Sequence, residues 1–401
     1  SLPVPLSIRN VLDSLAPTDD PAMLGRLGGY EVSGVVGAGG MGVVLKALDR
    51  SLDRMVAIKV LAPHLAASGA ARQRFAREAK AAAAVLHPNV IAIHGVMSGD
   101  DGSALPYLVM PYIRGSSLQT RIDTEGPLGV TEVLRIAIQI VEGLAAAHLQ
   151  GLVHRDIKPA NILLEEGVER VSITDFGLAR AVDDATLTHS GVIAGTPQYM
   201  SPEQARGEAI DSRSDLFSLG SVMYAMCTGR APFRAETSYG ILRRITDVSP
   251  RPIREVNPQV PGWLCRLIDR LHAKSPDDRY QSATSVARVL HQCLAHVQTP
   301  ESRLPRELQR PTGIQLLTRR VGLFAVSAVL FALTITVILY WPDRPQNAST
   351  AIDRDSADTE PASQTMPGLD WNDPAEPTLQ SVRSLIQTLD EETRRSFDEA
   401  P

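Results

Sequence analysis

The chain has 401 residues, a formal net charge of −5 and a charged fraction of 21%. Its length exceeds that of one average domain, and its ordinary charge balance offers no basic face that would indicate a nucleic-acid partner. The three cysteines, Cys227, Cys265 and Cys293, are too few and too widely spaced for a disulfide framework or a zinc site. We therefore expect them to be buried thiols in a reducing cytosol.

The chain divides into segments of different periodicity. Residues 1–29 mix Pro, Gly, Ser and Asp without a clear period and predict a loosely ordered lead-in. Short β-branched runs dominate residues 30–110 and predict a small β-rich lobe, interrupted by one helical stretch at 70–86. Helical periodicity dominates residues 114–297 and predicts a larger helical lobe. The predicted fold class is therefore α+β, with both lobes in one domain over residues 30–297. The three clearest strand runs are 32–36, 43–48 and 55–60.

An uncharged stretch follows the helical lobe. Residues 298–320 form an arginine-rich linker, and residues 321–341 then contain no charged side chain. A helix over these positions would be roughly 31 Å long, against a hydrocarbon core of about 30 Å. The alternative is a buried core helix, but a core helix of this length normally carries a polar face. We therefore predict one transmembrane helix that contacts the lipid bilayer.

Arginines near the two ends of this span predict its orientation. Five lie in residues 299–320, whereas only Arg344 and Arg354 lie in the first 20 positions after the span. The positive-inside bias then places the folded domain in the cytoplasm, at the cell (inner) membrane, and the tail outside. The tail, 342–401, is acidic and poor in apolar residues, so we expect it to be largely disordered and extracytoplasmic. Its one apolar stripe at helical spacing is Leu379, Val382, Leu385, Ile386 and Leu389.

Two short motifs in the second lobe carry chemistry. Residues 154–161 read H-R-D-I-K-P-A-N, and Asp175-Phe176-Gly177 follows fourteen residues later. Transfer of a phosphoryl group from ATP to a hydroxyl requires a proton acceptor, a cation for the phosphoryl oxygens and metal ligands. A carboxylate, an ammonium, an amide and a second carboxylate in this order supply those groups. The two motifs together favour an ATP-dependent phosphotransferase.

A glycine-rich motif near the start of the first lobe predicts a phosphate loop. Residues 37–44 match G-x-G-x-x-G-x-V. A dinucleotide-binding domain uses a similar motif to open a helix, but residues 43–48 read as a strand here. The P-loop pattern of other nucleotide hydrolases is missing from the sequence. The residues expected to cover the phosphates are Gly37, Ala38, Gly39, Gly40, Met41 and Gly42.

A lysine follows on a predicted strand. Lys59 ends the run V-A-I-K, seventeen residues after the last glycine of the motif. We predict that it contacts the α- and β-phosphates and forms an ion pair with Glu78 on the helix at 70–86.

These motifs resemble those of the eukaryotic-like (Hanks-type) serine/threonine kinases, specifically the bacterial, single-pass membrane-anchored branch. The resemblance covers residues 30–297 and implies the bilobal kinase fold. It also implies ATP as phosphoryl donor, protein Ser or Thr hydroxyls as acceptors, and Mg²⁺, with Mn²⁺ as an alternative ion. In this family Asp156 would accept the substrate proton, Lys158 would steady the γ-phosphoryl group, and Asn161 and Asp175 would hold the metal. A homodimer formed through the small lobe is a further implication.

The resemblance assigns further residues. Glu203 would pair with Arg279, and Asp215 would brace the catalytic loop as a structural residue. Met110 would stand beside the adenine, next to a hinge that contacts the base through backbone groups of Pro111 and Ile113. Proline keeps its carbonyl and loses only its N–H, so we expect that contact to survive. The residues expected to sandwich the base are Val44, Ala57, Leu163 and Thr174.

Three hydroxyls, Thr186, Thr188 and Ser190, lie between the D-F-G motif and Gly195. Arg155 next to Asp156 is the type of residue that binds a phosphorylated loop. We predict autophosphorylation at Thr188 and Ser190.

Two other functions fit the same fold. One is a pseudokinase scaffold that binds partners without catalysis. The sequence argues against this alternative, because it retains all the residues expected to bind ATP and metal and to catalyse transfer: Lys59, Glu78, Asp156, Asn161 and Asp175. The other is a small-molecule phosphotransferase of the aminoglycoside type, which would lack the long peptide-docking loop that ends at 201–203.

Overall fold

The computed structural model describes residues 6–98, 105–176, 197–299 and 301–309. The chain forms two units, 1–320 and 321–401, and all the described residues lie in the first unit. In the described ranges, no helix is both long enough and apolar enough to cross a membrane. The predicted span at 321–341, the tail with its apolar stripe, and Thr186, Thr188 and Ser190 lie outside the described residues.

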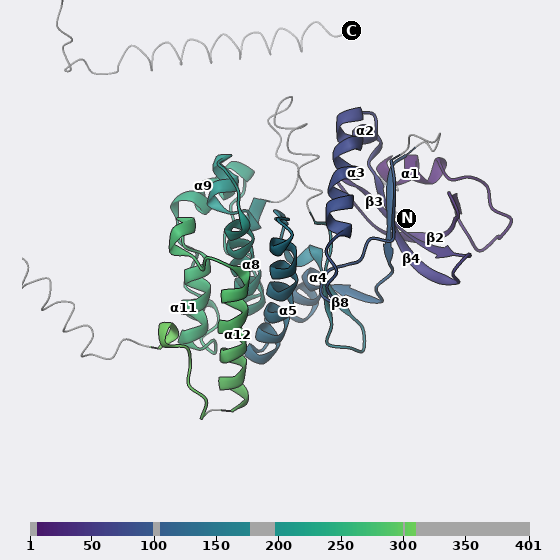
Figure 1. Ribbon diagram of the computed structural model, residues 1–401. Coiled ribbons are helices and arrows are strands. Elements are labelled where there is room, and N and C mark those ends of the chain that lie inside the picture. Colours follow the sequence, from purple (N-terminus) through teal and green to yellow (C-terminus); the bar gives the residue numbers. More distant parts are fainter. Residues whose placement is uncertain (1–5, 99–104, 177–196, 300, 310–401) are drawn as a thin grey trace, which may run out of the picture. The chain divides into compact units, whose positions relative to one another are not determined.

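The small lobe is built on a six-stranded sheet with the order β1-β2-β3-β4-β6-β5, in which all neighbouring strands are antiparallel (Figure 1). The three strand runs predicted from the sequence fall within β2, β3 and β4. Val43, Leu45 and Ala47 alternate along β3 as fully buried residues, which is the period of two expected of a strand. The strands are β1 (Gly25–Leu27), β2 (Tyr30–Gly39), β3 (Gly42–Asp49), β4 (Arg54–Leu61), β5 (Gly95–Met97) and β6 (Tyr107–Pro111).

Two helices follow β4, a short α2 (Pro63–Ala66) and the longer α3 (Gly69–Ala83). The Ser68 hydroxyl accepts a hydrogen bond from the Ala71 amide and caps the start of α3. Phe75 and Ala79 are buried on its inner face. The helix ends at Ala83, three residues before the predicted end at 86, and Pro88 disfavours a helical backbone at His87 beyond it.

The segment before residue 30 is ordered from residue 6 on, so the prediction of a loosely ordered lead-in is wrong for 6–29. Residues 6–13 form α1 (Leu6–Asp13), and Val11 on this helix is only 1% exposed. Ile8, Leu12 and Leu15 pack with Val11 against the core of the small lobe, and β1 pairs with β2. The i, i+4, i+7 spacing of Ile8, Leu12 and Leu15 forms one apolar stripe, which packs against the small-lobe core.

The large lobe is mainly helical and carries one three-stranded sheet, β7-β8-β9. Helix α8 is its centre, because every residue from Ser214 to Thr228 is buried. Gly220 on α8 lies so close to α11 that a Cβ atom there would meet Leu271 Cβ at 2.8 Å. The elements are α4 (Leu118–Glu125), α5 (Val130–Leu149), α7 (Pro202–Arg206), α8 (Ser212–Thr228), α9 (Ser238–Asp247), α10 (Ile253–Val256), α11 (Gly262–Leu271) and α12 (Ala283–Gln298), with β7 (Gly115–Ser117), β8 (Ile162–Glu165) and β9 (Val171–Ile173), and the 3₁₀ turns η1 (Pro159–Asn161), η2 (Pro197–Tyr199), η3 (Pro276–Asp278) and η4 (Arg306–Leu308).

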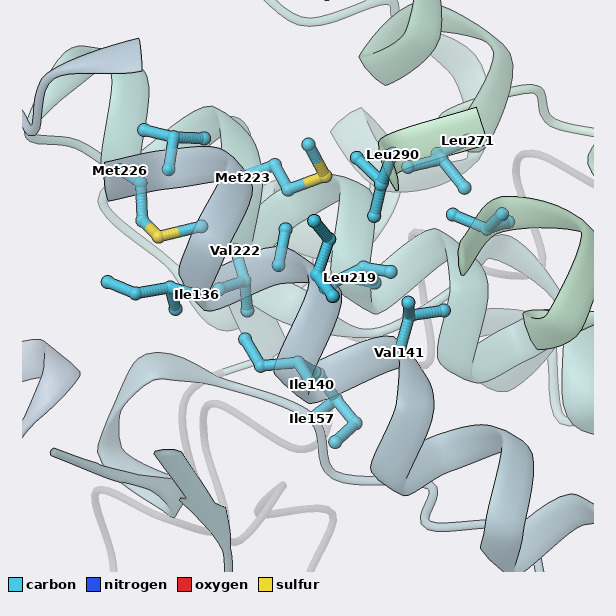
Figure 2. Close-up of a cluster of buried hydrophobic side chains, with 14 of the residues drawn as sticks. Ile136, Ile140, Val141, Ile157, Leu219, Val222, Met223, Met226, Leu271 and Leu290 are labelled. Carbon is cyan, nitrogen blue, oxygen red and sulfur yellow. The ribbon is translucent and has the colours of Figure 1, made fainter. Parts of the chain in front are cut away.

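One hydrophobic core joins α5, α8, α11 and α12. Figure 2 shows Ile140 and Val141 of α5 close to Leu219 and Val222 of α8. Ile157 of the catalytic loop belongs to the same cluster and is 1% exposed. The H-R-D segment is therefore anchored in the core through an apolar side chain that sits between its charged residues.

The described part of the linker does not leave the domain after α12. Residues 301–309 turn back onto α11, where Leu308 is 2% exposed. The Arg266 guanidinium donates to the Leu308 carbonyl, and Arg270 Nη1 lies 2.6 Å from Glu307 Oε2. Residues 301–309, which the sequence analysis treated as linker, thus pack as an extension of the large lobe.

Together these elements form the two-lobed architecture with a β-rich small lobe and a helical large lobe, as expected from the sequence.

Candidate active site

The registers of three neighbouring strands bring the predicted adenine-binding residues together. Val44 lies opposite Lys59, and Ala57 lies opposite Met110. Since opposed residues share a sheet face and alternate residues along a strand return to it, these four side chains occupy one face of the sheet. Leu163, on β8 of the large lobe, packs against the same small-lobe cluster and faces them across the two lobes.

The phosphate loop is the turn of the β2–β3 hairpin. Gly37 pairs with Val44 and Gly39 with Gly42, which leaves Gly40 and Met41 at the tip. Gly42 has φ +152°, and a Cβ atom there would lie 1.9 Å from the Val60 carbonyl oxygen. A larger residue at position 42 would push β4 away, so a glycine is required where the loop rejoins the sheet.

The hinge connects the two lobes directly after β6. Pro111 is the last residue of β6 and pairs with Val56, and Tyr112 and Ile113 are half-buried beyond it. The Lys46 ammonium lies 4.7 Å from the centroid of the Tyr112 ring, a cation–π distance. The backbone groups predicted to contact adenine thus follow a paired strand, which fixes their position.

Three predicted functional groups meet at one carboxylate oxygen. Lys158 Nζ lies 2.7 Å from Asp156 Oδ2, and Asn161 Nδ2 lies 3.0 Å from the same oxygen. The Asn161 amide also donates to the Asp156 carbonyl at 2.8 Å. The Asp156 carboxylate therefore has a fixed orientation and an adjacent cation, and it is accessible, with a side chain 25% exposed.

Lys59 has a different ion-pair partner from the predicted one. Lys59 Nζ lies 2.7 Å from Asp175 Oδ1, so among the described residues this pair replaces the expected Lys59–Glu78 contact. The Lys59 side chain is only 7% exposed, and an ammonium at this depth requires a nearby carboxylate. Burial raises the pKa of Asp175, but the Lys59 ammonium outweighs this effect and holds the pKa below its usual range. Glu78 lies on α3, as predicted.

The remaining donor atoms suit Mg²⁺. Asn161 uses its amide nitrogen toward Asp156, which leaves its Oδ1 oxygen as an acceptor. The low pKa of Asp175 keeps its carboxylate ionised. Carboxylate and amide oxygens, completed by phosphate oxygens, are the ligands that Mg²⁺ prefers. In the described ranges, no group of three or more His, Cys, Asp or Glu residues could hold a metal ion without such help.

Asp215 holds the backbone of the catalytic loop through hydrogen bonds. Its two carboxylate oxygens accept hydrogen bonds from the amides of His154 and Arg155, each at 2.8 Å. His154 is fully buried, and its Nε2 lies 2.9 Å from the Thr174 carbonyl oxygen. The ring thus links the H-R-D loop to the residue before Asp175. Arg155, which carries the second of these two amides, has a positive φ of 69°.

Two contacts on this loop were missed by the sequence analysis. His148 of α5 places Nε2 2.8 Å from Asp215 Oδ2. Gln204 donates its side-chain amide to the Arg155 carbonyl at 2.7 Å, while its Oε1 accepts from the Ser201 amide. The S-x-x-Q pattern at 201–204 is a capping-box signature and could have revealed the local half of the Gln204 contact. No local sequence signal marks the contact of His148 with Asp215.

A buried ion pair anchors the loop that ends at residue 203. Arg279 Nη1 and Nη2 donate to the two oxygens of Glu203 at 2.7 and 2.8 Å, which places these two predicted partners in contact. Ser214 adds a third donor at 2.5 Å. Burial raises the pKa of Glu203, but the hydrogen bonds from Arg279 and Ser214 outweigh it and lower the pKa to about 2. The carboxylate is therefore ionised at any physiological pH.

Comparisons with known proteins agree with this geometry. A family model described as the protein kinase domain matches residues 30–297. The chain is 37% identical over 289 residues to the probable serine/threonine-protein kinase PknB of Corynebacterium glutamicum, an alignment that covers 68% of this chain and 45% of that protein. It is 40% identical over 256 residues to the serine/threonine-protein kinase PrkC of Bacillus subtilis, which covers 64% of this chain and 39% of that protein.

Solved structures include the same architecture. The crystal structure of the PknI kinase domain from Mycobacterium tuberculosis superposes with a TM-score of 0.54 at 27% identity, and the match covers 66% of this chain and 96% of that domain. The chain spans less than half the length of the two curated relatives. The similarity therefore concerns the two-lobed domain, and the rest of those relatives has no counterpart in the alignment.

Proposed function

Because the chain belongs to the protein kinase family, in its bacterial serine/threonine branch, we propose that it transfers the γ-phosphoryl group of ATP to Ser or Thr hydroxyls of proteins. The observation that carries this proposal is the convergence of Lys158 and Asn161 on one oxygen of Asp156. A carboxylate with a fixed orientation can accept the hydroxyl proton while the neighbouring ammonium attracts the phosphoryl oxygens.

The other residues of the site would position ATP. Val44, Ala57, Met110 and Leu163 offer apolar surface for the adenine, and Lys59 would exchange its contact with Asp175 for the phosphates. Asn161 and Asp175 would hold Mg²⁺, which when bound neutralises charge on the phosphate oxygens. Little covalent chemistry falls to the protein in this reaction, so positioning and charge neutralisation supply the rate.

Labelling with [γ-³²P]ATP tests this function. The full-length protein, purified in mild detergent with Mg²⁺, should incorporate label on Ser or Thr by phosphoamino-acid analysis, and Asp156→Asn should incorporate none. Equal labelling of the two proteins would contradict the role of Asp156. Nucleotide binding without labelling in either protein would favour the pseudokinase scaffold, for which no described residue offers specific support.

We also propose that the loop after the D-F-G motif is autophosphorylated at Thr188 and Ser190. Arg155 supports this proposal, because its Nε atom is buried and has no hydrogen-bond partner within the described chain. A phosphate group would satisfy that guanidinium with charge-assisted hydrogen bonds. Digestion and mass spectrometry of protein treated with ATP and Mg²⁺ should find phosphate in the 178–195 segment. An active preparation that lacks it there would refute the proposal.

Finally, we propose that residues 321–341 anchor the protein in the cell membrane by a single pass, with the kinase domain in the cytoplasm. The 21-residue uncharged sequence and the excess of arginines before it support this topology. Signalling across or along the membrane would follow from such an anchor.

A further inference from the structure

Four arginines surround one hollow of the large lobe. The hollow has a volume of about 200 Å³ and lies where the end of α8, the loop to α9, and the segment before α10 meet. All four arginine side chains are exposed, and no Asp or Glu is among the described residues that line the hollow. We call this feature the arginine cavity, defined by Arg230, Arg234, Arg244 and Arg251.

Most of the positive charge in the arginine cavity has no counter-charge. Arg251 pairs with Glu255 at 3.1 Å, but both side chains are more than half exposed. Arg230, Arg234 and Arg244 form no ion pair with any described residue. The neighbouring Arg243, by contrast, lies outside the cavity and pairs with Asp247 at 3.7 Å. Because guanidinium groups stay charged at all physiological pH values, the cavity concentrates a positive field that attracts anions.

The walls of the cavity are held in place. The Tyr224 hydroxyl donates to the Arg251 carbonyl at 2.9 Å, and the Thr228 hydroxyl donates to the Arg230 carbonyl at 3.0 Å. Phe233, 1% exposed, fixes the loop between α8 and α9. Small-molecule pockets usually measure about 300–1,000 Å³. A cavity below that range fits one anionic side chain or phosphate group better than a whole nucleotide.

The position of the cavity favours a protein as the source of the anion. Phe233 belongs to a hydrophobic cluster with Phe217, Ile241 and Ile245, and Met200 packs against that cluster. Met200 lies in the 195–203 segment, which resembles the substrate-docking loop. One side-chain cluster therefore connects the cavity with the segment that is expected to hold a peptide.

We propose that the arginine cavity binds an acidic segment of the protein substrates, carrying carboxylates or phosphates, outside the residues that enter the catalytic cleft. The proposal rests on the proposed kinase function for the identity of the partner, whereas binding of the acidic segment does not require catalysis. Arginine is suited to this role because its planar fork pairs with carboxylate and phosphate groups through two hydrogen bonds.

Binding is measured by the fluorescence anisotropy of a fluorescein-labelled hexaglutamate peptide with the full-length protein in mild detergent at low ionic strength. A labelled hexaglutamine peptide serves as the uncharged probe. The test variant is Arg234→Glu/Arg244→Glu, and the control is Arg243→Glu, an exposed arginine that neighbours Arg244 on α9 but lies outside the cavity. We expect the double variant to weaken hexaglutamate binding about ten-fold or more, because two cavity arginines then become carboxylates that repel the peptide. The control should stay close to wild type, because Arg243 lies outside the cavity.

A second measurement links the cavity to phosphorylation. The double variant should lower kcat/KM for dephosphorylated casein, an acidic protein, and should leave kcat/KM for myelin basic protein near the wild-type value. Asp156→Asn should still bind hexaglutamate like wild type. If wild type incorporates no label on itself or on either protein, the proposed function fails while the binding result stands on its own.

Three outcomes would overturn the proposal: equal affinity of wild type for hexaglutamate and hexaglutamine, an equal loss in Arg243→Glu and the double variant, or capture of phosphatidylglycerol vesicles through Arg234 and Arg244 without peptide binding. The Arg234→Ala/Arg244→Ala variant should also lose affinity for hexaglutamate, but less than the glutamate variant. The difference between the two variants separates charge repulsion from loss of contact.

Discussion

At the residue scale, the ion pairs Lys59–Asp175 and Glu203–Arg279 differ in how much water reaches them. Glu203 and Arg279 are almost completely buried and share two parallel hydrogen bonds. Asp175, the partner of Lys59, is 26% exposed. A partly hydrated carboxylate can exchange its partner for a metal ion or a phosphate, whereas the buried pair has no competitor. We therefore assign exchange of partners to the Lys59–Asp175 pair and structural support to the Glu203–Arg279 pair.

Replacement of Lys59 tests the role of the exchangeable pair. Lys59→Met should lower kcat by about 10²–10³, or roughly 2.7–4 kcal/mol, by analogy with the removal of one charge-stabilising donor. The measurement is steady-state transfer of phosphate to a protein substrate. Lys80→Met, on the exposed face of α3, should retain the wild-type rate. Wild-type turnover by Lys59→Met would refute the assignment of this lysine.

The pKa of Glu203 predicts a pH dependence of stability. Its value in the folded protein is about 2, below the ordinary value of 4.5. A lowered pKa contributes stability above the unfolded-state value, and this contribution is lost as the pH falls from about 4.5 toward 2. The contribution at pH 7 is on the order of 3 kcal/mol.

Urea unfolding checks this expectation. Wild type should exceed Glu203→Gln in free energy of unfolding at pH 7, and the difference should shrink as the pH falls below 4.5. A difference that stays constant with pH would show that Glu203 acts by packing alone.

At the scale of elements, α1 is one of the features that extend the domain beyond the matched family region. Its residues precede position 30, where the family model begins. Val11 fills a site in the core of the small lobe, so α1 stabilises the sheet that carries Lys59 and the phosphate loop.

Truncation of a single side chain tests the contribution of α1. Val11→Ala removes two buried methyl groups and should destabilise the protein by about 1.5–3 kcal/mol. Chemical denaturation followed by circular dichroism measures this loss. Arg9→Ala on the exposed side of the same helix should leave the unfolding midpoint unchanged.

The sequence predicted the positions of strands better than it predicted which side chains contact one another. Strands 32–36, 43–48 and 55–60 lie inside β2, β3 and β4, because alternation of apolar residues is a local property. The pairing of Lys59 with Asp175 and the contact of His148 with Asp215 join residues 116 and 67 positions apart. Such contacts depend on how elements pack, and local periodicity contains no information on that. The apolar stripe of α1 is present in the sequence at i, i+4, i+7 spacing. The surrounding Pro and Gly residues favoured a loop prediction over a helix prediction.

At the scale of the whole molecule, the site is shared between two lobes, and a membrane anchor would restrict where it acts. Alkaline carbonate extraction of membranes from expressing cells should leave the full-length protein in the pellet. A variant that lacks residues 321–341 should move to the supernatant. Protease added to intact spheroplasts should remove the tail and spare the kinase domain. Cleavage of the kinase domain under these conditions would reverse the proposed orientation.

If residues 321–341 span the bilayer as proposed, the packing of residues 301–309 against α11 would limit the distance between the catalytic site and the membrane. Since Leu308 is buried in the domain, only the 11 residues 310–320 separate the folded part from the proposed span. Fully extended, they reach roughly 40 Å at most. The active site would then stay close to the membrane surface. Proteins that are themselves membrane-bound have a high effective concentration there. By packing against the domain, residues 301–309 would make the location of a substrate at the membrane contribute to its selection, in addition to its amino-acid sequence.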